Sequence, residues 1–172
     1  LEIKADSKYA NVMERALFNG VLSGMALDGK SFFYVNPLES LPEACHRDER
    51  KFHVKPIRQK WFGCACCPSN ISRFIPSLPG YVYASEGKNL YVNLYLANNM
   101  THKLEGRKVA VSQQTDYPWS GDVMLSIDEN KAGEFALKLR IPGWVRGEVV
   151  PSDLYSFADD VQTAYSVSVN GE

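Results

Sequence analysis

The hydrophobic pattern changes its period near residue 80, and this change constrains the fold more than any other feature of the chain. Before it, apolar side chains recur at intervals of three and four residues, which predicts an amphipathic helix; they are Val12, Met13, Ala16, Leu17 and Val21. After Gly80 the sequence alternates between apolar and polar residues, which predicts strands. We therefore expect a helical domain over residues 1–80 and a β domain over residues 81–172.

The alternating runs in the second part are short and separated by turn signals. They cover residues 81–83, 90–96, 108–114, 123–128, 135–141 and 165–169. The first two flank Ser85–Lys88 and predict a hairpin, and Asn98-Asn99 is interpreted as a turn. Short strands at regular spacing are typical of an antiparallel β-sandwich. Asn170-Gly171 is a hairpin signal without a returning strand, so we expect a chain that is truncated at both ends.

In the first part, Asp6 or Ser7 can cap the opening helix. Residues 31–35, S-F-F-Y-V, are aromatic and β-branched and predict a strand that ends at Asn36-Pro37. Residues 39–60 show no clean period and are interpreted as one long loop, a feature that often borders a functional site. Pro68 suits the first position of a second, short helix.

Composition narrows the possible partners. The 172 residues are 45% hydrophobic and 23% charged, the values of an ordinary globular protein. Nineteen basic residues are scattered among 20 acidic ones for a net charge of −1, so no basic stripe for nucleic acid is present. No apolar run approaches the roughly 20 residues that span a bilayer. We expect neither a nucleic-acid nor a membrane partner.

Residues 61–70, W-F-G-C-A-C-C-P-S-N, hold three of the four cysteines. One interpretation is inert buried thiols. A second is a disulfide or a redox pair between Cys64 and Cys67, which have C-x-x-C spacing but no βαβ pattern around them. A third is a reactive site: with Pro68 as the first helical residue, Cys67 is the N-cap and Cys66 precedes it. Thiols at a helix N-terminus have a depressed pKa.

A thiolate is also the form that binds metal, and zinc needs three or four ligands in total. The other side chains of this chain that can supply one are Glu43, Cys45, His46, His53 and Cys64. The residues alone therefore predict a thiolate site with metal assistance, without specifying the reaction.

Several segments together resemble the zinc-dependent β-L-arabinofuranosidase family of glycoside hydrolases. They are K-Y-A-N-V-M-E-R-A-L-F-N-G, F-F-Y-V-N-P-L-E, W-F-G-C-A-C-C-P-S-N-I-S-R, T-D-Y-P-W-S-G and L-R-I-P-G-W, and they occur in the order the family has them. C-A-C-C-P-x-N is the most specific of these motifs. The resemblance extends over nearly the whole chain.

The resemblance implies a mixed α and β fold: the end of an (α/α)6 barrel over residues 1–80, followed by an antiparallel β-sandwich over 81–172. It implies a bacterial retaining glycoside hydrolase that acts on glycans containing β-linked L-arabinofuranose or on related sugars. By position in the motif, Cys66 is the nucleophile and a zinc ligand, and Cys67 is a second zinc ligand. Tyr34 and Asn36 are expected near the sugar.

One departure from the family pattern matters. The remaining zinc ligands, in an E-x-C motif, and the general acid/base glutamate normally precede the helix with which this chain begins. Glu43-Ala44-Cys45 has the same spelling but follows the F-Y-V-N-P segment, and we interpret it as coincidental. We therefore expect an incomplete zinc site, an inactive isolated chain, and the remainder of its own polypeptide as a partner.

An alternative is a non-catalytic β-sandwich module that binds carbohydrate or packs against other domains, with structural cysteines. Tyr117, Trp119 and Trp144 are its candidate sugar-stacking residues, although such aromatics also fill cores and interfaces. The sequence leaves the cellular address open between a bacterial cytoplasm and a periplasm.

Overall fold

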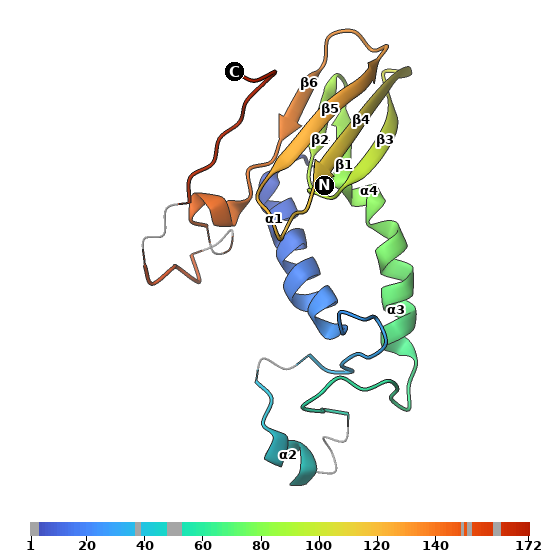
Figure 1. Cartoon of the computed structure of the whole chain (residues 1–172), viewed down its shortest axis with the longest axis vertical. Helices are drawn as coiled ribbons and strands as arrows, with labels where there is room; N and C mark the ends of the chain where they lie inside the picture. The colour runs from blue at the N-terminus through green and yellow to red at the C-terminus, as the bar shows by residue number, and fades with distance from the viewer. Residues whose placement is uncertain (1–3, 37–38, 48–52, 149, 151–152, 160–162) are drawn as a thin grey trace. The chain divides into compact units, whose positions relative to one another are not determined.

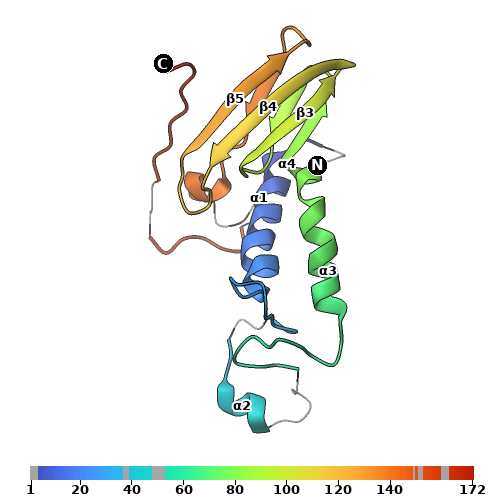
Figure 2. The same cartoon turned by 45° about the vertical axis from the view of Figure 1, so that its right-hand side comes forward.

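The computed structural model describes residues 4–36, 39–47, 53–148, 150, 153–159 and 163–172 (Figures 1 and 2). The chain divides into two compact units, residues 1–12 with 79–172, and residues 13–78. Within the described residues, no helix has the length and apolar content needed to cross a membrane.

The opening helix forms where the apolar period predicts it. Helix α1 covers Ser7–Arg15 and continues as a π-helical turn, η1 (Ala16–Val21), and a 3-10 turn, η2 (Leu22–Gly24). Asp6, rather than Ser7, is the cap: its Oδ1 accepts a hydrogen bond from the backbone N–H of Lys8 at 3.1 Å. Ala10 and Leu17 are buried, whereas Val12 is 51% exposed and lies off the buried face.

The predicted strand at residues 31–35 is wrong. Only Phe32 forms bridges, with Met25 on one side and Gln59 on the other. The backbone N–H of Phe33 donates to Gly24 O, and Ala26 N–H donates to Ser31 O. These contacts close a tight loop in which Gly29 has a φ of 69°, so no ladder can extend from Phe32.

The predicted loop at residues 39–60 contains a short helix, α2 (Pro42–Arg47). Proline at the first helical position and Glu43 in the first turn both favour a helix start, a signal that outweighs the absence of a longer apolar period. Helix α3 (Cys66–Phe74) follows, and the chain then continues through η4 (Ile75–Ser77) and α4 (Pro79–Val82).

The second part holds two three-stranded sheets, visible as layers of arrows in Figures 1 and 2. One has the order β1 (Tyr83–Glu86), β2 (Asn89–Val92), β6 (Ala136–Leu139), and the other the order β3 (Asn98–Leu104), β4 (Arg107–Thr115), β5 (Val123–Asn130). The predicted β1–β2 hairpin is confirmed, with Gly87 (φ 54°) in its turn. An all-antiparallel arrangement is wrong, because β6 pairs parallel to β2.

Strand β3 lies where Asn98-Asn99 predicted a turn. The turn lies instead at Glu105-Gly106, with φ values of 48° and 81°, the conformation of a two-residue hairpin loop. The predicted strand at 165–169 is also absent: these residues have no strand pairing, although Val169 and Glu172 exchange backbone hydrogen bonds around Asn170-Gly171.

Both sheets contribute to one hydrophobic core. Its buried centre consists of Leu90 from β2, Leu104 from β3, and Val109 and Val111 from β4. Val109 and Val111 are fully buried because they share one face of β4, where side chains alternate between the two faces. Burying a side chain of this size stabilises the fold by roughly 1.5–3 kcal/mol.

A buried arginine ties α1 to the β-rich unit. Arg140 is 5% exposed, and its Nη1 donates to Asn11 Oδ1 at 2.9 Å. Asn11 Oδ1 also accepts from the backbone N–H of Gly143 at 3.2 Å. The Arg140 Nε donates to Asn93 O, and the guanidinium lies 5.7 Å from the Tyr95 ring centre. The charge is therefore solvated by protein oxygen atoms instead of water.

Candidate active site

The first turn of α3 presents two cysteines. Ala65 is the N-cap, so Cys66, Cys67 and Pro68 are the first three helical residues, and the helix begins two residues before the predicted start. Proline is tolerated at this third position because the first four N–H groups of a helix have no partner within it. Both sulfurs are therefore inside the first turn, not before it.

The two thiol groups lie side by side. The Sγ atoms of Cys66 and Cys67 are 3.6 Å apart, and the Cys67 Sγ lies 3.8 Å from the carbonyl oxygen of Tyr34. Cys66 is exposed and Cys67 is half-buried. Two sulfurs at about 2.3 Å from one tetrahedral zinc are about 3.8 Å from each other, so the observed separation matches a shared ion.

The two thiols differ in acidity. Hydrogen bonds from Cys64 first, and from Cys67 and Tyr34, lower the pKa of the Cys66 thiol. The pKa of Cys67 is raised, chiefly by burial and then by its hydrogen bond with Cys66. The expectation of a depressed pKa for helix N-terminal thiols thus holds for Cys66 and fails for Cys67, because Cys67 is turned away from water.

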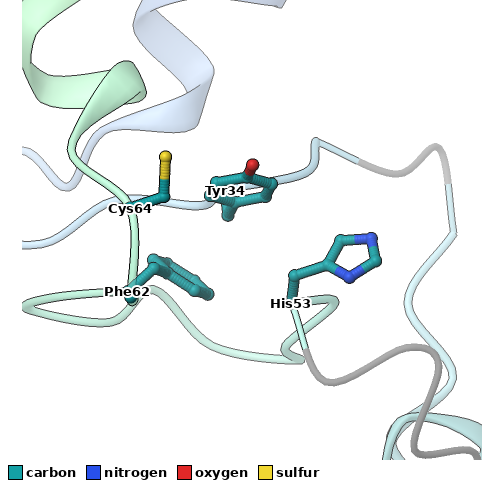
Figure 3. Close-up of a pocket in the computed structure, with 5 residues that line it drawn as sticks. Tyr34, His53, Phe62 and Cys64 are labelled. Atoms are coloured by element: carbon teal, nitrogen blue, oxygen red, sulfur yellow. The ribbon is translucent and has the colours of Figure 1, made fainter.

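Tyr34 lies next to the cysteines, and its ring is fixed by other aromatic rings. Its ring centre lies 5.6 Å from that of Phe62 and 5.7 Å from that of His53, the latter in an edge-on arrangement (Figure 3). The neighbouring thiols of Cys66, which has the larger effect, and of Cys64 raise the pKa of the Tyr34 hydroxyl.

Two cavities meet at Tyr34. One, of about 320 Å³, is lined by Tyr34, His53, Phe62, Gly63 and Cys64, and Figure 3 shows four of these side chains. The other, of about 560 Å³, is lined in part by Tyr34, Asn36, Cys66 and Cys67. The structure thus brings together the four residues that were expected at the site from the sequence. The volume of the larger cavity is within the range of small-molecule pockets.

Asn36 has polar contacts of its own. Its Nδ2 donates to Ser23 Oγ at 2.8 Å and to Gly20 O at 3.3 Å. Arg58 Nη2 donates to Ser23 O, and its guanidinium lies 4.7 Å from the Phe33 ring centre. The Asn36 and Arg58 side chains thus donate hydrogen bonds to oxygen atoms at the end of the α1–η1–η2 segment. The last carbonyl groups of a helix have no partner within it.

Glu43 and Cys45 lie on α2. Glu43 Oε2 accepts a hydrogen bond from Arg47 Nη2 at 2.8 Å, an exposed i, i+4 ion pair, and Cys45 is half-buried. Among the described residues, no group of three or more His, Cys, Asp or Glu side chains is placed to hold a metal ion. The side chain of His46 lies outside the described part of the structure.

Sequence reasoning named Cys64 as a partner of Cys67 and as a candidate ligand, but missed its influence on the pKa values of Cys66 and Tyr34. It missed Arg58 altogether. Arg58 carried no signal, since its role depends on a contact with Ser23 across 35 residues of sequence.

The aromatic side chains of the β-rich unit have varied exposure. Trp119 is 87% exposed and Trp144 44% exposed. Trp144 Nε1 donates to Tyr117 Oη at 3.2 Å, and the Tyr117 ring meets that of Tyr95 edge-on at 5.9 Å. Tyr117 and Trp144 therefore contact each other, and Trp119 is the most exposed of the three.

The chain is similar to known proteins along most of its length. Residues 1–80 match the family described as β-L-arabinofuranosidase, GH127 catalytic domain, and residues 89–172 match the GH127 middle domain. All of the chain aligns, at 35% identity, with 24% of a non-reducing end β-L-arabinofuranosidase from Bifidobacterium longum subsp. longum.

Two solved structures are also similar. A GH127 β-arabinofuranosidase has a TM-score of 0.84 and 54% identity over 97% of this chain and 24% of its own. A GH127 β-L-arabinofuranosidase from Geobacillus stearothermophilus T6 has a TM-score of 0.76 and 55% identity over 86% of this chain and 23% of its own. The chain spans about a quarter of the length of these relatives.

Proposed function

Because the chain belongs to the GH127 family of β-L-arabinofuranosidases, we propose that the protein carrying it is a retaining glycoside hydrolase with Cys66 as its nucleophile. Its substrates are glycans with β-linked L-arabinofuranose or a related sugar. The observation that carries this proposal is the exposed Cys66 sulfur, with its lowered pKa, beside Cys67 and a cavity of about 560 Å³.

The donor set fits zinc in part. Cys66 and Cys67 are thiol donors at a separation of 3.6 Å that suits one tetrahedral ion, and they would hold it together with ligands from elsewhere in the protein. A bound zinc supplies a positive charge that keeps the thiol groups ionised at neutral pH. Glu43 and Cys45 stay as the weaker ligand candidates of this chain.

Cys66 performs the covalent step. Its sulfur attacks the anomeric carbon, the bond from that carbon to the leaving oxygen breaks, and a glycosyl thioether forms on Cys66. Water then attacks the same carbon, the carbon–sulfur bond breaks, and Cys66 returns as a thiolate. Two displacements retain the configuration of the sugar, as in glycosidases with a carboxylate nucleophile. The general acid/base belongs to a part of the protein outside these residues.

Tyr34 and Asn36 shape the sugar pocket. The Tyr34 hydroxyl donates to the Cys66 sulfur, which stabilises the anionic form before attack, and its ring forms an apolar wall. Asn36 lines the same cavity while its amide nitrogen holds the backbone at Gly20. Its Oδ1 is the atom we assign to a sugar hydroxyl.

In the complete protein, residues 1–80 form the end of an (α/α)6 barrel and residues 81–172 most of a β-sandwich. The isolated chain is inactive, because most of the pocket and half of the zinc ligands belong to the remaining three quarters of the relatives' length.

The experiment is a hydrolysis assay of the full-length protein on an aryl β-L-arabinofuranoside. We expect activity in the wild type, loss in Cys66→Ala and Cys66→Ser, and zinc in the purified protein by elemental analysis. Full activity in both variants would rule out the nucleophile assignment. Absence of hydrolysis of any arabinofuranoside by the wild type would contradict the substrate class.

A second candidate function concerns the β-rich unit, where Trp119 is 87% exposed. Two hydrogen bonds hold the turn that contains Trp119. The backbone N–H of Trp119 donates to Asp116 O at 2.8 Å, and Thr115 Oγ1 donates to Asp122 O at 2.6 Å. A fixed, exposed indole suits stacking on a sugar ring. Binding to a glycan array by the wild type that is lost in Trp119→Ala would support a carbohydrate-binding module. Equal binding by the wild type and Trp119→Ala would argue against it.

A further inference from the structure

The third thiol of the cluster forms no bond to the sugar in the proposed hydrolysis. Cys64 is exposed and lies outside α3, in the segment that leads into the helix. It lies two residues before Cys66 and close enough to lower the pKa of Cys66 and raise that of Tyr34, and Figure 3 shows its sulfur on the same side of the backbone as the Tyr34 hydroxyl. A thiol that contacts an exposed nucleophilic sulfur can also react with it.

We propose that Cys64 and Cys66 form an oxidation site, in which Cys64 resolves a sulfenic acid on Cys66 into a Cys64–Cys66 disulfide when the protein meets a peroxide. The disulfide would switch off hydrolysis reversibly. This consequence rests on the proposed function, whereas the formation of the bond does not.

The backbone between the two residues permits the bond. Ala65 has φ −96° and ψ 12°, a folded conformation that brings the Cα atoms of its two neighbours close together. We place that separation at roughly 5–6 Å, inside the range of about 4.4–6.8 Å that disulfides span. Because Cys64 precedes the helix, its side chain can rotate without disturbing a helical turn.

The other pairings are less suitable. Cys66 and Cys67 are adjacent helical residues, and their sulfurs, at 3.6 Å, would have to approach to about 2.05 Å across one trans peptide bond. The Cys67 sulfur points toward Tyr34 O and is half-buried, so it is turned from solvent and from an incoming oxidant. Cys66 is therefore the sulfur that is oxidised first, and Cys64 its partner.

The chemistry balances with peroxide as the only co-reactant. The Cys66 sulfur attacks one peroxide oxygen, the O–O bond breaks, and Cys66 becomes a sulfenic acid while the other oxygen leaves as water after protonation. The Cys64 sulfur then attacks the Cys66 sulfur, the S–O bond breaks, and a second water leaves with the Cys64 proton. Two thiols lose two electrons, and one peroxide gains them.

The site would also protect Cys66. A sulfenic acid without a neighbouring thiol proceeds to sulfinic and sulfonic acids, which thiol reductants do not reverse. Bound zinc shields the Cys66 sulfur, so oxidation competes with metal binding, and a Cys66 sulfur in a disulfide is no longer a thiolate ligand.

The test uses the full-length protein, treated with hydrogen peroxide and analysed by peptide mass after blocking free thiols. We expect a peptide that has lost two hydrogens, with Cys64 joined to Cys66, accompanied by release of zinc and restored by dithiothreitol. In Cys64→Ser we expect two or three added oxygens on Cys66 and no recovery.

Three results would overturn the proposal: a disulfide that joins Cys66 to Cys67, a disulfide that contains Cys45, or oxidation of Cys66 to the same irreversible product in wild type and Cys64→Ser. A Cys64–Cys66 disulfide in a protein that still hydrolyses arabinofuranosides at full rate would leave the oxidation site in place. That result would instead contradict the role of Cys66 in hydrolysis.

Discussion

The Sγ atoms of Cys66 and Cys67 lie 3.6 Å apart in the first turn of α3, yet their pKa values shift in opposite directions. Cys66 is exposed and receives hydrogen bonds, whereas Cys67 is half-buried beside a carbonyl oxygen. Two neighbouring residues of the same type thus differ in acidity, and the proposed nucleophile, Cys66, is the more acidic of the two.

The first prediction concerns alkylation of the metal-free, full-length protein by iodoacetamide. Because the pKa of Cys66 is lowered, its thiolate forms at lower pH, and Cys66 should be modified at a pH at which Cys67 is not. Cys64→Ala removes the largest cause of the shift, so the Cys66 profile should move to higher pH. Peptide mass spectrometry against pH measures both profiles, and modification of Cys67 ahead of Cys66 would contradict the assignment.

Tyr34→Phe removes the hydroxyl of Tyr34 and keeps its ring. The ring contacts with Phe62 and His53 stay, so the melting temperature should hardly change. The variant loses a donor to an ionised sulfur, so turnover in the full-length protein should fall by about tenfold. Equal turnover in wild type and Tyr34→Phe would show that the hydroxyl has no part in the reaction.

Gly143 lies against two polar side chains that an added Cβ would have to displace. A Cβ there would lie 2.7 Å from Asn11 Nδ2 and 2.9 Å from Glu148 Oε2, so Gly143→Ala should lower the free energy of unfolding by about 1–3 kcal/mol. Gly121→Ala is the matched control, because no atom lies within 4 Å of its added Cβ. Urea unfolding measures both changes.

The clash at Gly143 can be traced to one partner. In an Asn11→Ala background the nearest obstructing atoms are gone, so the further loss from Gly143→Ala should shrink. If the losses in unfolding free energy from Asn11→Ala and Gly143→Ala simply add, the strain at Gly143 does not involve Asn11.

Leu90→Ala tests the shared core of the two sheets. Leu90 is 1% exposed and packs with Leu104, Val109 and Val111 across the sheets, so its truncation should cost about 2–5 kcal/mol of unfolding free energy. Met124→Ala, at a side chain that is 55% exposed on β5, should change it by less than about 0.5 kcal/mol. Similar losses at both positions would contradict a core centred on Leu90.

Periodicity in the sequence predicted the elements whose side chains repeat regularly. Helix α1 and strands β4 and β5 lie where the apolar residues recur, because burial of one face determines each of them. It failed at Asn98-Asn99, where two residues typical of turns lie in β3 and pair with Gln113 and Ser112. It also failed at residues 31–35, where Phe32 bridges two segments without extending into a strand.

At the candidate site, the resemblance implied Cys66 and Cys67 as zinc ligands and Tyr34 and Asn36 near the sugar. All four line one cavity in the structure, and their roles stay predictions. The motif did not predict the inequality of the two thiols, which depends on burial and on Cys64. The parallel pairing of β2 with β6 was also out of reach, because it depends on contacts between residues 47 positions apart, such as Leu90 and Leu137.

The most direct test of the account is to identify the residue that carries the sugar during turnover. The full-length protein is mixed with an aryl β-L-arabinofuranoside whose leaving group departs rapidly, quenched in acid, digested and analysed by mass spectrometry. The account predicts a pentosyl group on the Cys66 sulfur and none in Cys66→Ser. A pentosyl group on an aspartate, on a glutamate or on a different cysteine would contradict it.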